Sequence, residues 1–307
     1  MQQSASAEPT HPYEYMIMKR LTFIAALLFV FTSLSAQTEK FQQRYNLLVS
    51  KLGPAGVGIE TLLDNWAMAD STDEKLLAAR FDYYLAKAQS TEVVKKSSKK
   101  YLGMSPLLTL KDSLGRDVYY YQEVSYDDEL FGKAVKAAEK AVGLYPDKLD
   151  YRFMKANAYI SYEKESPDMA LAYLLELVQT DASRERPWTY GGEKMDDSFF
   201  EEAIQEYCYS FFQIGSPQSK DAFFKLSQAM NSLHPDNLSF INNMGSYYMV
   251  AKEDYKGALK LYKKVLKKNP SDPIALQNSI IAAKKLGNTK LEAKYRQQFE
   301  AISASQK

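Results

Sequence analysis

Residues 237–270 read NLSFINNMGSYYMVAKEDYKGALKLYKKVLKKNP, and this stretch decides the fold of the chain. Its apolar residues recur at steps of three and four, which predicts two amphipathic helices joined by a short turn. In the first predicted helix the small residue Gly245 is followed three positions later by Tyr248. In the second, Ala258 is followed four positions later by Tyr262, and Pro270 ends the helix. Small residues among large ones predict that the two helices pack closely.

This pattern resembles the tetratricopeptide repeat (TPR), a helix–turn–helix unit of about 34 residues. Two features depart from the family pattern: one extra residue in the turn, around residues 252–255, and Val265 at a position where a smaller residue is usual. The resemblance implies an all-α solenoid of helical hairpins, in which neighbouring hairpins bury each other's apolar faces. It also implies a concave face, lined by the first helices, that in this family commonly holds an extended peptide or a partner helix.

Alanines equivalent to Ala258 recur along the chain and set the register of the repeats. Ala134 and Ala170 are 36 residues apart, Ala222 and Ala258 are also 36 apart, and Ala293 follows after 35. These intervals are close to the family period. The same pattern assigns the first helices, with Ala156 and Tyr159 in one unit and the poorer match of Ser210 and Gln213 in another. The sequence therefore predicts TPR-like repeats over residues 128–302.

One interval breaks the register, because Ala170 and Ala222 are 52 residues apart. The surplus of 16 residues over the usual 36 falls in a connector at 180–197, which contains Trp188 and Tyr190. Long loops on a rigid scaffold often bind ligands. The favoured interpretation is a loop folded back on the repeats, with Trp188 covering a helix pair.

Residues 91–127 are the least repeat-like part of the chain. Four lysines in 95–100 predict a basic, solvated loop, and two β-prone runs around a glycine turn predict a small β-hairpin or irregular insert near 105–125. The organisation that follows is an N-terminal extension and signal peptide at 1–36, helices and a degenerate repeat at 37–90, the insert at 91–127, the repeats at 128–302 and a tail at 303–307.

The N-terminus has the three parts of a secretory signal peptide. Lys19 and Arg20 precede an uncharged apolar run, residues 21–34, and cleavage is expected after Ala36. The run is short for a membrane span, so we expect no span after cleavage. An uncleaved anchor is the alternative. Met18 is the expected true start, and the mature chain is expected in the periplasm or envelope of a Gram-negative bacterium.

Composition limits the chemistry that the chain can carry. A net charge of +1 gives no general attraction to nucleic acid. Cys208 is the single cysteine and His11 and His234 are the two histidines, too few for a disulfide or a usual zinc site. His234, beside Pro235, is predicted to be a solvated loop residue. We therefore expect no metal, no cofactor and no catalytic residues. Acidic clusters at 127–129 and 196–202 are assigned to helix starts, where carboxylates are favoured.

The resemblance to TPR proteins assigns a set of inward-facing positions on the first helices. These are Phe153, Asn157 and Ile160 in one repeat, and Ser239, Asn242, Ser246 and Met249 in another. One TPR subclass clamps a peptide's terminal carboxylate with Lys and Asn. Asn157 fits that pattern, but Phe153 stands where the clamp needs Lys.

Two binding functions follow from these assignments. The first is a non-catalytic scaffold or adaptor of the cell envelope, which binds a protein or peptide partner on the concave face. The alternative is an envelope glycan-binding protein that stacks sugar rings on the aromatic residues of the inserts, Tyr119, Tyr120, Tyr121, Trp188 and Tyr190.

Overall fold

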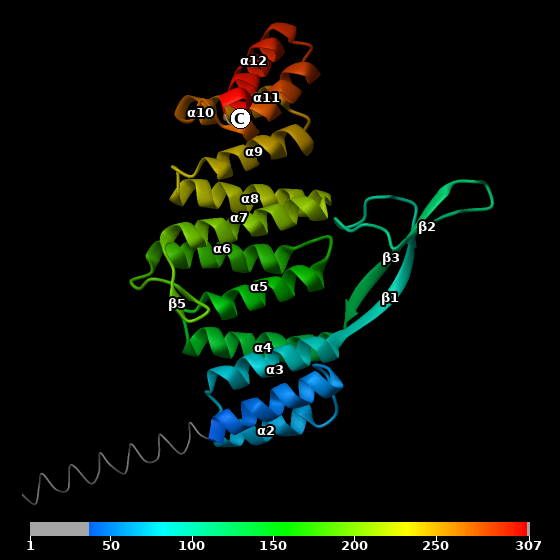
Figure 1. The fold of residues 1–307 in the computed structure, drawn as a ribbon, viewed down its shortest axis with the longest axis vertical. Coiled ribbons are helices and arrows are strands. Elements are labelled where there is room, and N and C mark those ends of the chain that lie inside the picture. The colour runs from blue at the N-terminus through cyan, green and yellow to red at the C-terminus, as the bar shows by residue number, and fades with distance from the viewer. Residues whose placement is uncertain (1–36, 306–307) are drawn as a thin grey trace, which may run out of the picture. The chain divides into compact units, whose positions relative to one another are not determined.

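The computed structural model of this 307-residue chain describes residues 37–305, and it is built mainly from paired helices (Figure 1). The predicted signal peptide at 1–36 lies outside the described residues. A first helix spans 37–52. The helices that follow are α2 (Ile59–Ala69), α3 (Glu74–Ala88), α4 (Asp128–Leu144), α5 (Leu149–Glu163), α6 (Asp168–Ser183), α7 (Asp197–Ile214), α8 (Pro217–Leu233), α9 (Leu238–Val250), α10 (Tyr255–Lys268), α11 (Pro273–Lys285) and α12 (Thr289–Ser305). The strands are β1 (Gln89–Lys96), β2 (Leu108–Lys111), β3 (Asp117–Tyr126), β4 (Thr189–Tyr190) and β5 (Glu193–Lys194). Among the described residues, no helix is long and apolar enough to span a membrane.

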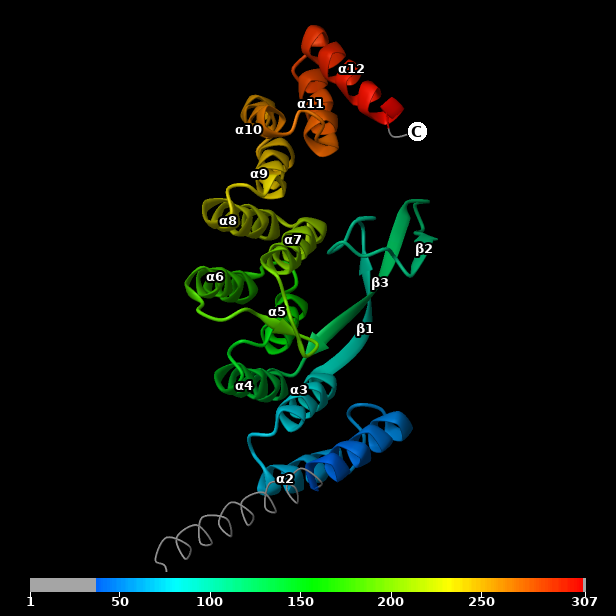
Figure 2. The same cartoon turned by 60° about the vertical axis from the view of Figure 1, so that its left-hand side comes forward.

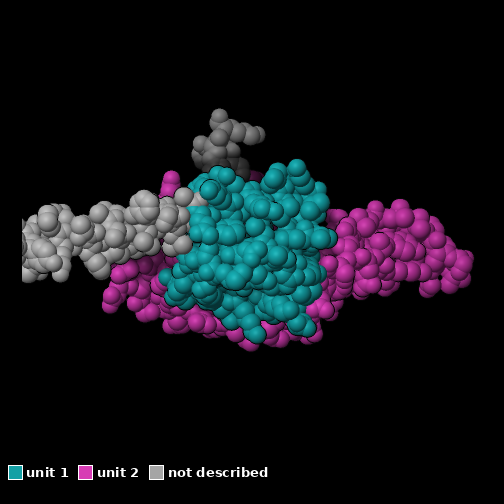
Figure 3. Space-filling view, turned by 90° about the horizontal axis from the view of Figure 1, so that it is seen from below, with its two compact units in different colours: residues 1–87, 129–144 teal, residues 88–128, 145–307 magenta. Residues whose placement is uncertain are grey.

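The chain divides into two compact units, which Figure 3 colours separately. Within its described part, the first unit contains the helix at 37–52, α2, α3 up to residue 87, and α4 from residue 129. Its core is a cluster around Trp66, which is fully buried and stacks on Phe41 with ring centroids 6.0 Å apart. The glycine-rich turn before α2 is a simple helix connection, and Gly58 caps α2 with a left-handed φ of 84°. Helices thus occupy residues 37–52, 59–69 and 74–88, as the sequence predicted.

Helices α3 and α4 form a helix pair although 39 residues, 89–127, separate them in sequence. Lys140 of α4 donates a hydrogen bond to the Ser71 carbonyl oxygen just before α3, and the Lys133 ammonium lies 5.9 Å from the Tyr84 ring centroid. Ala134, which the register assigned to a second helix, is fully buried. Hence α3 is the missing first helix of this repeat, and the insert replaces its turn.

The second unit contains four further helix pairs: α5–α6, α7–α8, α9–α10 and α11–α12. Each pair packs together, and α8 packs on α9 as α10 packs on α11 (Figure 2). Side-chain caps start several of these helices, as where Asp254 accepts a hydrogen bond from the Gly257 N–H. Gly245 allows α9 and α10 to approach closely, because the Tyr262 ring of α10 occupies the space that a β-carbon at residue 245 would need. The predicted all-α, helical-hairpin repeat solenoid is therefore confirmed, and the fold is TPR-like.

Two predicted register positions are wrong. In α7 the buried small and aromatic residues are Cys208 and Phe211, both fully buried, whereas Ser210 is half-buried and Gln213 is exposed. The true register of α7 therefore lies two residues earlier. In α12 the predicted key residue Ala293 is exposed, because this helix packs on α11 through a face that carries Tyr295.

The insert is a three-stranded antiparallel sheet with the order β1–β3–β2, which is larger than the predicted hairpin. Residues 91–96 of the predicted basic loop belong to β1, because they pair with β3 from Tyr119 to Val124. The β2–β3 turn is held by Asp112, whose carboxylate accepts hydrogen bonds from the N–H groups of Leu114 and Arg116. Lys95 and Lys96 are thus strand residues.

A salt bridge and a close backbone approach hold this sheet to the repeats of the second unit. Lys164, at the end of α5, donates a hydrogen bond of 2.5 Å to Glu123 of β3, and Tyr101 donates one of 2.9 Å to the same carboxylate. Farther along, Gly103 has a φ of +72°, and a β-carbon there would lie 2.8 Å from the Gln213 carbonyl oxygen at the end of α7. The insert therefore lies along the turns that follow the first helices α5 and α7.

Candidate functional site

The predicted binding residues of α5 are partly covered. Phe153 is half-buried, and the Tyr190 ring of the connector lies over it with centroids 5.9 Å apart. Ile160 is half-buried against the main core, whereas Asn157 is exposed. Two backbone N–H groups fix the connector there: Thr189 donates to the Asp147 carbonyl at 2.9 Å, and Gly191 to the Asp150 carboxylate at 3.0 Å. The connector therefore closes part of this face.

The predicted binding residues of α9 differ in how deeply they are buried. Asn242 is only 3 % exposed, and it donates a hydrogen bond to Asp272, the cap of α11. Ser246 is half-buried, and its hydroxyl donates to the Asn242 carbonyl at 3.0 Å. Ser239 and Met249 are also half-buried. The structure thus assigns Asn242 to helix packing, contrary to the prediction, because its amide is needed at the junction of α9 and α11. The α5 and α9 sets lie on helices separated by α7, so they do not form one cluster (Figure 1).

The corrected register of α7 identifies face residues that the sequence analysis missed. Tyr209 takes the position of Ser246, and Phe212 takes that of Met249. Tyr209 is 53 % exposed, and Ile281, the corresponding residue of α11, is 42 % exposed. The α9 and α11 parts of this face meet where Asn278 Nδ2 lies 3.5 Å from Ser246 Oγ. The missed signal was Cys208, a small residue three positions before an aromatic one.

A pocket of 560 Å³ adjoins this face at the ends of α7 and α9. Its walls include Tyr101 and Met104 of the insert loop, Phe212 of α7 and Val250 of α9. The sheet and the repeats that line it belong to the same compact unit. The insert thus adds a wall to the first-helix face.

The insert aromatics divide into buried and accessible residues. Tyr121 is fully buried, and its hydroxyl donates to the Ser98 carbonyl at 3.0 Å. Trp188 is 2 % exposed and stacks on Phe200 with ring centroids 6.1 Å apart. Tyr119 is half-buried, and Tyr190 is 43 % exposed. Neither Tyr121 nor Trp188 can therefore stack on a sugar ring in this structure, whereas Tyr119 and Tyr190 remain accessible. The connector is thus folded back on the helices, with Trp188 covering them, as the sequence predicted.

Trp188 is held by a group of charged residues beneath the connector. The Asp181 carboxylate, which is 8 % exposed, accepts hydrogen bonds of 2.8 Å from Trp188 Nε1 and from Arg184 Nε. His234 Nδ1 lies 2.9 Å from Glu201, and its Nε2 lies 3.4 Å from Asp181. His234 is thus a partly buried residue between two carboxylates, contrary to the predicted solvated loop residue.

Neither a metal-binding cluster nor a reactive thiol is found among the described residues. No group of three or more His, Cys, Asp and Glu side chains between residues 37 and 305 could hold a metal ion. Burial raises the pKa of Cys208 to about 12. The Ser227 hydroxyl donates a hydrogen bond to the sulfur, which lowers this pKa by a smaller amount. The thiol therefore stays protonated at neutral pH, when a nucleophile would need the thiolate.

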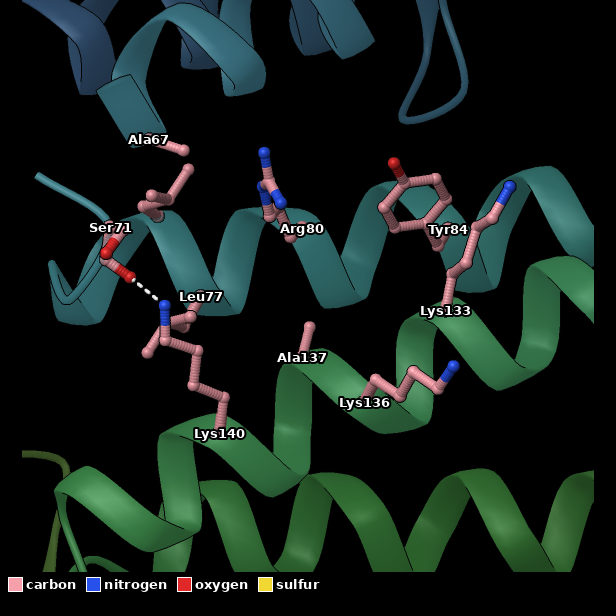
Figure 4. Close-up of a pocket in the computed structure, with 10 residues that line it drawn as sticks. Ala67, Ser71, Leu77, Arg80, Tyr84, Lys133, Lys136, Ala137 and Lys140 are labelled. Carbon is pink, nitrogen blue, oxygen red and sulfur yellow. Dashed lines mark hydrogen bonds between the residues drawn. The ribbon is translucent and has the colours of Figure 1, made fainter. Parts of the chain in front are cut away.

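A second pocket, of 330 Å³, lies within the first unit between α3 and α4 (Figure 4). Arg80 of α3 and Lys133, Lys136 and Lys140 of α4 line it, together with Tyr84. The three lysines are exposed and stand on one side of α4, and Arg80 is half-buried. We call this group of four cations the basic pocket.

Comparisons with known proteins give no function for this chain. No protein-family model and no curated protein matches the chain. Two crystal structures of MamA are similar to it with TM-scores of 0.39 and 0.38, at 17 % and 18 % identity; they cover 58 % and 57 % of this chain, and 91 % and 83 % of those chains. The crystal structure of the P58(IPK) TPR domain has a TM-score of 0.25 at 11 % identity, covering 97 % of this chain and 70 % of that one. Likenesses with TM-scores below 0.5 do not establish a function, and the TPR-like fold rests on the helix pairs themselves.

Proposed function

We propose that this protein is a non-catalytic scaffold of the cell envelope that binds an extended peptide or a helix of a protein partner. The binding surface is the first-helix face of α7, α9 and α11. One observation carries the proposal: two large apolar side chains, Tyr209 and Ile281, are exposed at equivalent positions of this face. The envelope setting rests on the predicted signal peptide.

Single exposed apolar residues are common on soluble proteins, so their exposure alone would mean little. Here the equivalent positions follow one another through successive repeats, with the half-buried Ser246 between Tyr209 and Ile281. Serine and amide groups such as Asn278 can bond the backbone of a peptide, while the apolar side chains contact its side chains. Aromatic residues at such positions are frequent hot spots of binding.

The inserts favour this part of the face over α5. Tyr190 covers Phe153, so a predicted contact of α5 is removed. The pocket bounded by Phe212 and the insert loop lies beside the remaining contacts. A side chain or chain end of the partner fits there, with the rest of the peptide along α9 and α11.

The test is capture of the partner from the native envelope. A photo-crosslinking residue is placed at Tyr209 or Ile281, and crosslinked proteins are identified by mass spectrometry. We expect one partner at both positions, and Ile281→Asp should abolish its co-purification with the protein. Met68→Asp is the matched control, because Met68 is 78 % exposed and belongs to the other unit. The proposal would be overturned if a partner co-purified equally with wild type and with Ile281→Asp and no protein were crosslinked at Tyr209 or Ile281.

A further inference from the structure

The basic pocket of the first unit brings four cationic side chains together, although the net charge of the whole chain is only +1. Lys133, Lys136 and Lys140 are spaced by three and four residues along α4, which places them on one side of the helix. Leu76, Leu77 and Ala137, which are buried, also line the pocket (Figure 4). Charged groups beside an apolar surface are less screened by water, so they attract a counter-charge more strongly.

The carboxylates around the pocket neutralise only part of this charge. Asp64 pairs with Arg80 at 2.7 Å, and Glu129 pairs with Lys133 at 2.8 Å. A third carboxylate, Glu60, accepts hydrogen bonds from Lys87, Tyr83 and Tyr84.

Lys136 is the donor of the pocket that is left for a ligand, since it has no ion-pair partner among residues 37–305. The Nε of Arg80 also lacks an acceptor in this part of the chain, but it is buried and a ligand cannot reach it. Lys140 is held by a neutral group, the Ser71 carbonyl oxygen. A bound anion would supply the counter-charge that Lys136 lacks.

We propose that the basic pocket binds an acidic segment of a protein partner through the carboxylates of its Asp and Glu side chains. Lys133 and Lys140 are seven residues apart, which is about 10 Å along a helix. An extended peptide advances about 3.3 Å per residue and its alternate side chains share one face, so carboxylates four residues apart, about 13 Å, can reach the two outer lysines. Lys136 then meets a carboxylate between them. This site is built from α3 and α4 and uses neither Phe153 nor Asn157, the positions assigned to the TPR carboxylate clamp, and it does not depend on the proposed function.

The probe is fluorescein-labelled hexaglutamate, and the readout is fluorescence anisotropy with the purified protein at low salt. Hexaglutamate should bind, and hexaglutamine should not. Lys136→Glu should raise the dissociation constant by about fivefold, and Lys136→Gln should raise it less. The matched control is Lys75→Glu, an exposed position on α3 that does not line the pocket and carries the same charge change. It should change the constant by less than about twofold, since long-range effects of exposed charges are screened.

Three outcomes would overturn the inference. The first is that hexaglutamate binds no better than hexaglutamine. The second is that Lys75→Glu weakens binding as much as Lys136→Glu, which would mean a general charge effect. The third is that inorganic phosphate displaces the peptide at a lower concentration than free hexaglutamate does, which would mark a site for small anions. Thermal unfolding should be unchanged in all three variants, because the substituted lysines are exposed. Ile281→Asp should bind hexaglutamate normally, which separates this test from that of the proposed function.

Discussion

Replacement of Gly245 by alanine tests whether close helix packing fixes the repeat register. A β-carbon at Gly245 would lie 2.5 Å from Tyr262 Cε1, 2.8 Å from Cζ and 3.1 Å from Cδ1. The Tyr262 ring cannot move aside freely, because it is fully buried and its hydroxyl lies 3.3 Å from Ser246 Oγ. The substitution therefore forces α9 and α10 apart or strains the ring.

Two opposing effects set the size of the change. Alanine is favoured over glycine inside a helix by about 1 kcal/mol. Overpacking a buried site by one methyl group costs roughly 1–3 kcal/mol. We expect steric cost to win, because the three contacts are with a rigid ring, and Gly245→Ala to lower the free energy of unfolding by about 1 kcal/mol. Gly143→Ala is the control, since a β-carbon there meets no atom within 4 Å. It should raise the free energy of unfolding by about 0.5–1 kcal/mol.

The assay is urea-induced unfolding followed by circular dichroism, with the midpoints of the two variants compared with wild type. In a Tyr262→Leu background the ring is absent, so Gly245→Ala should become neutral or stabilising. If Gly245→Ala stabilises the wild-type protein as much as Gly143→Ala does, the packing argument is wrong.

Two further predictions concern ionisable groups. The Lys164 ammonium, and to a smaller extent the Tyr101 hydroxyl, lower the pKa of Glu123 below its usual 4.5. The ionised Glu123 therefore stabilises the fold at a pH above its unfolded-state pKa. This stabilisation is lost as the pH falls through the lower folded-state pKa. Glu123→Gln should therefore weaken the fall in melting temperature between about pH 5 and pH 3, and an unchanged slope would contradict this reading. The buried Cys208 thiol, whose pKa is about 12, should not react with a thiol-specific disulfide reagent at pH 8 until urea unfolds the protein, and rapid labelling of the native protein would contradict its burial.

The repeats could be predicted from sequence because their spacing is local and their small residues are distinctive. Ala134, Ala170, Ala222 and Ala258 are all buried, as the register requires. The prediction failed where another residue type fills the same space. Cys208 is about as small as alanine and is often buried, but it was not counted as a packing residue.

The inserts could not be predicted in the same way, because contacts between distant residues determine them. Lys164 is 41 residues from Glu123, and no pattern in the sequence indicates that these two residues form a pair. His234 was misjudged for a similar reason: Glu201 and Asp181, which flank it, lie 33 and 53 residues earlier. The length of the connector showed that something interrupts the repeats, but its aromatic residues did not show whether they point to solvent or to the core.

The burial of Trp188 changes where a partner can bind. Because the Asp181 carboxylate accepts its indole N–H, Trp188 holds the connector against the helices and leaves Tyr190 over Phe153. The connector therefore strengthens the α5 end of the stack while it removes apolar area from its face. The same face remains open farther along, at Tyr209 and Ile281, because the connector contacts α7 near its N-terminal end, at Phe199 and Phe200. An interruption in the repeat register thus determines which of several equivalent repeat positions stay accessible.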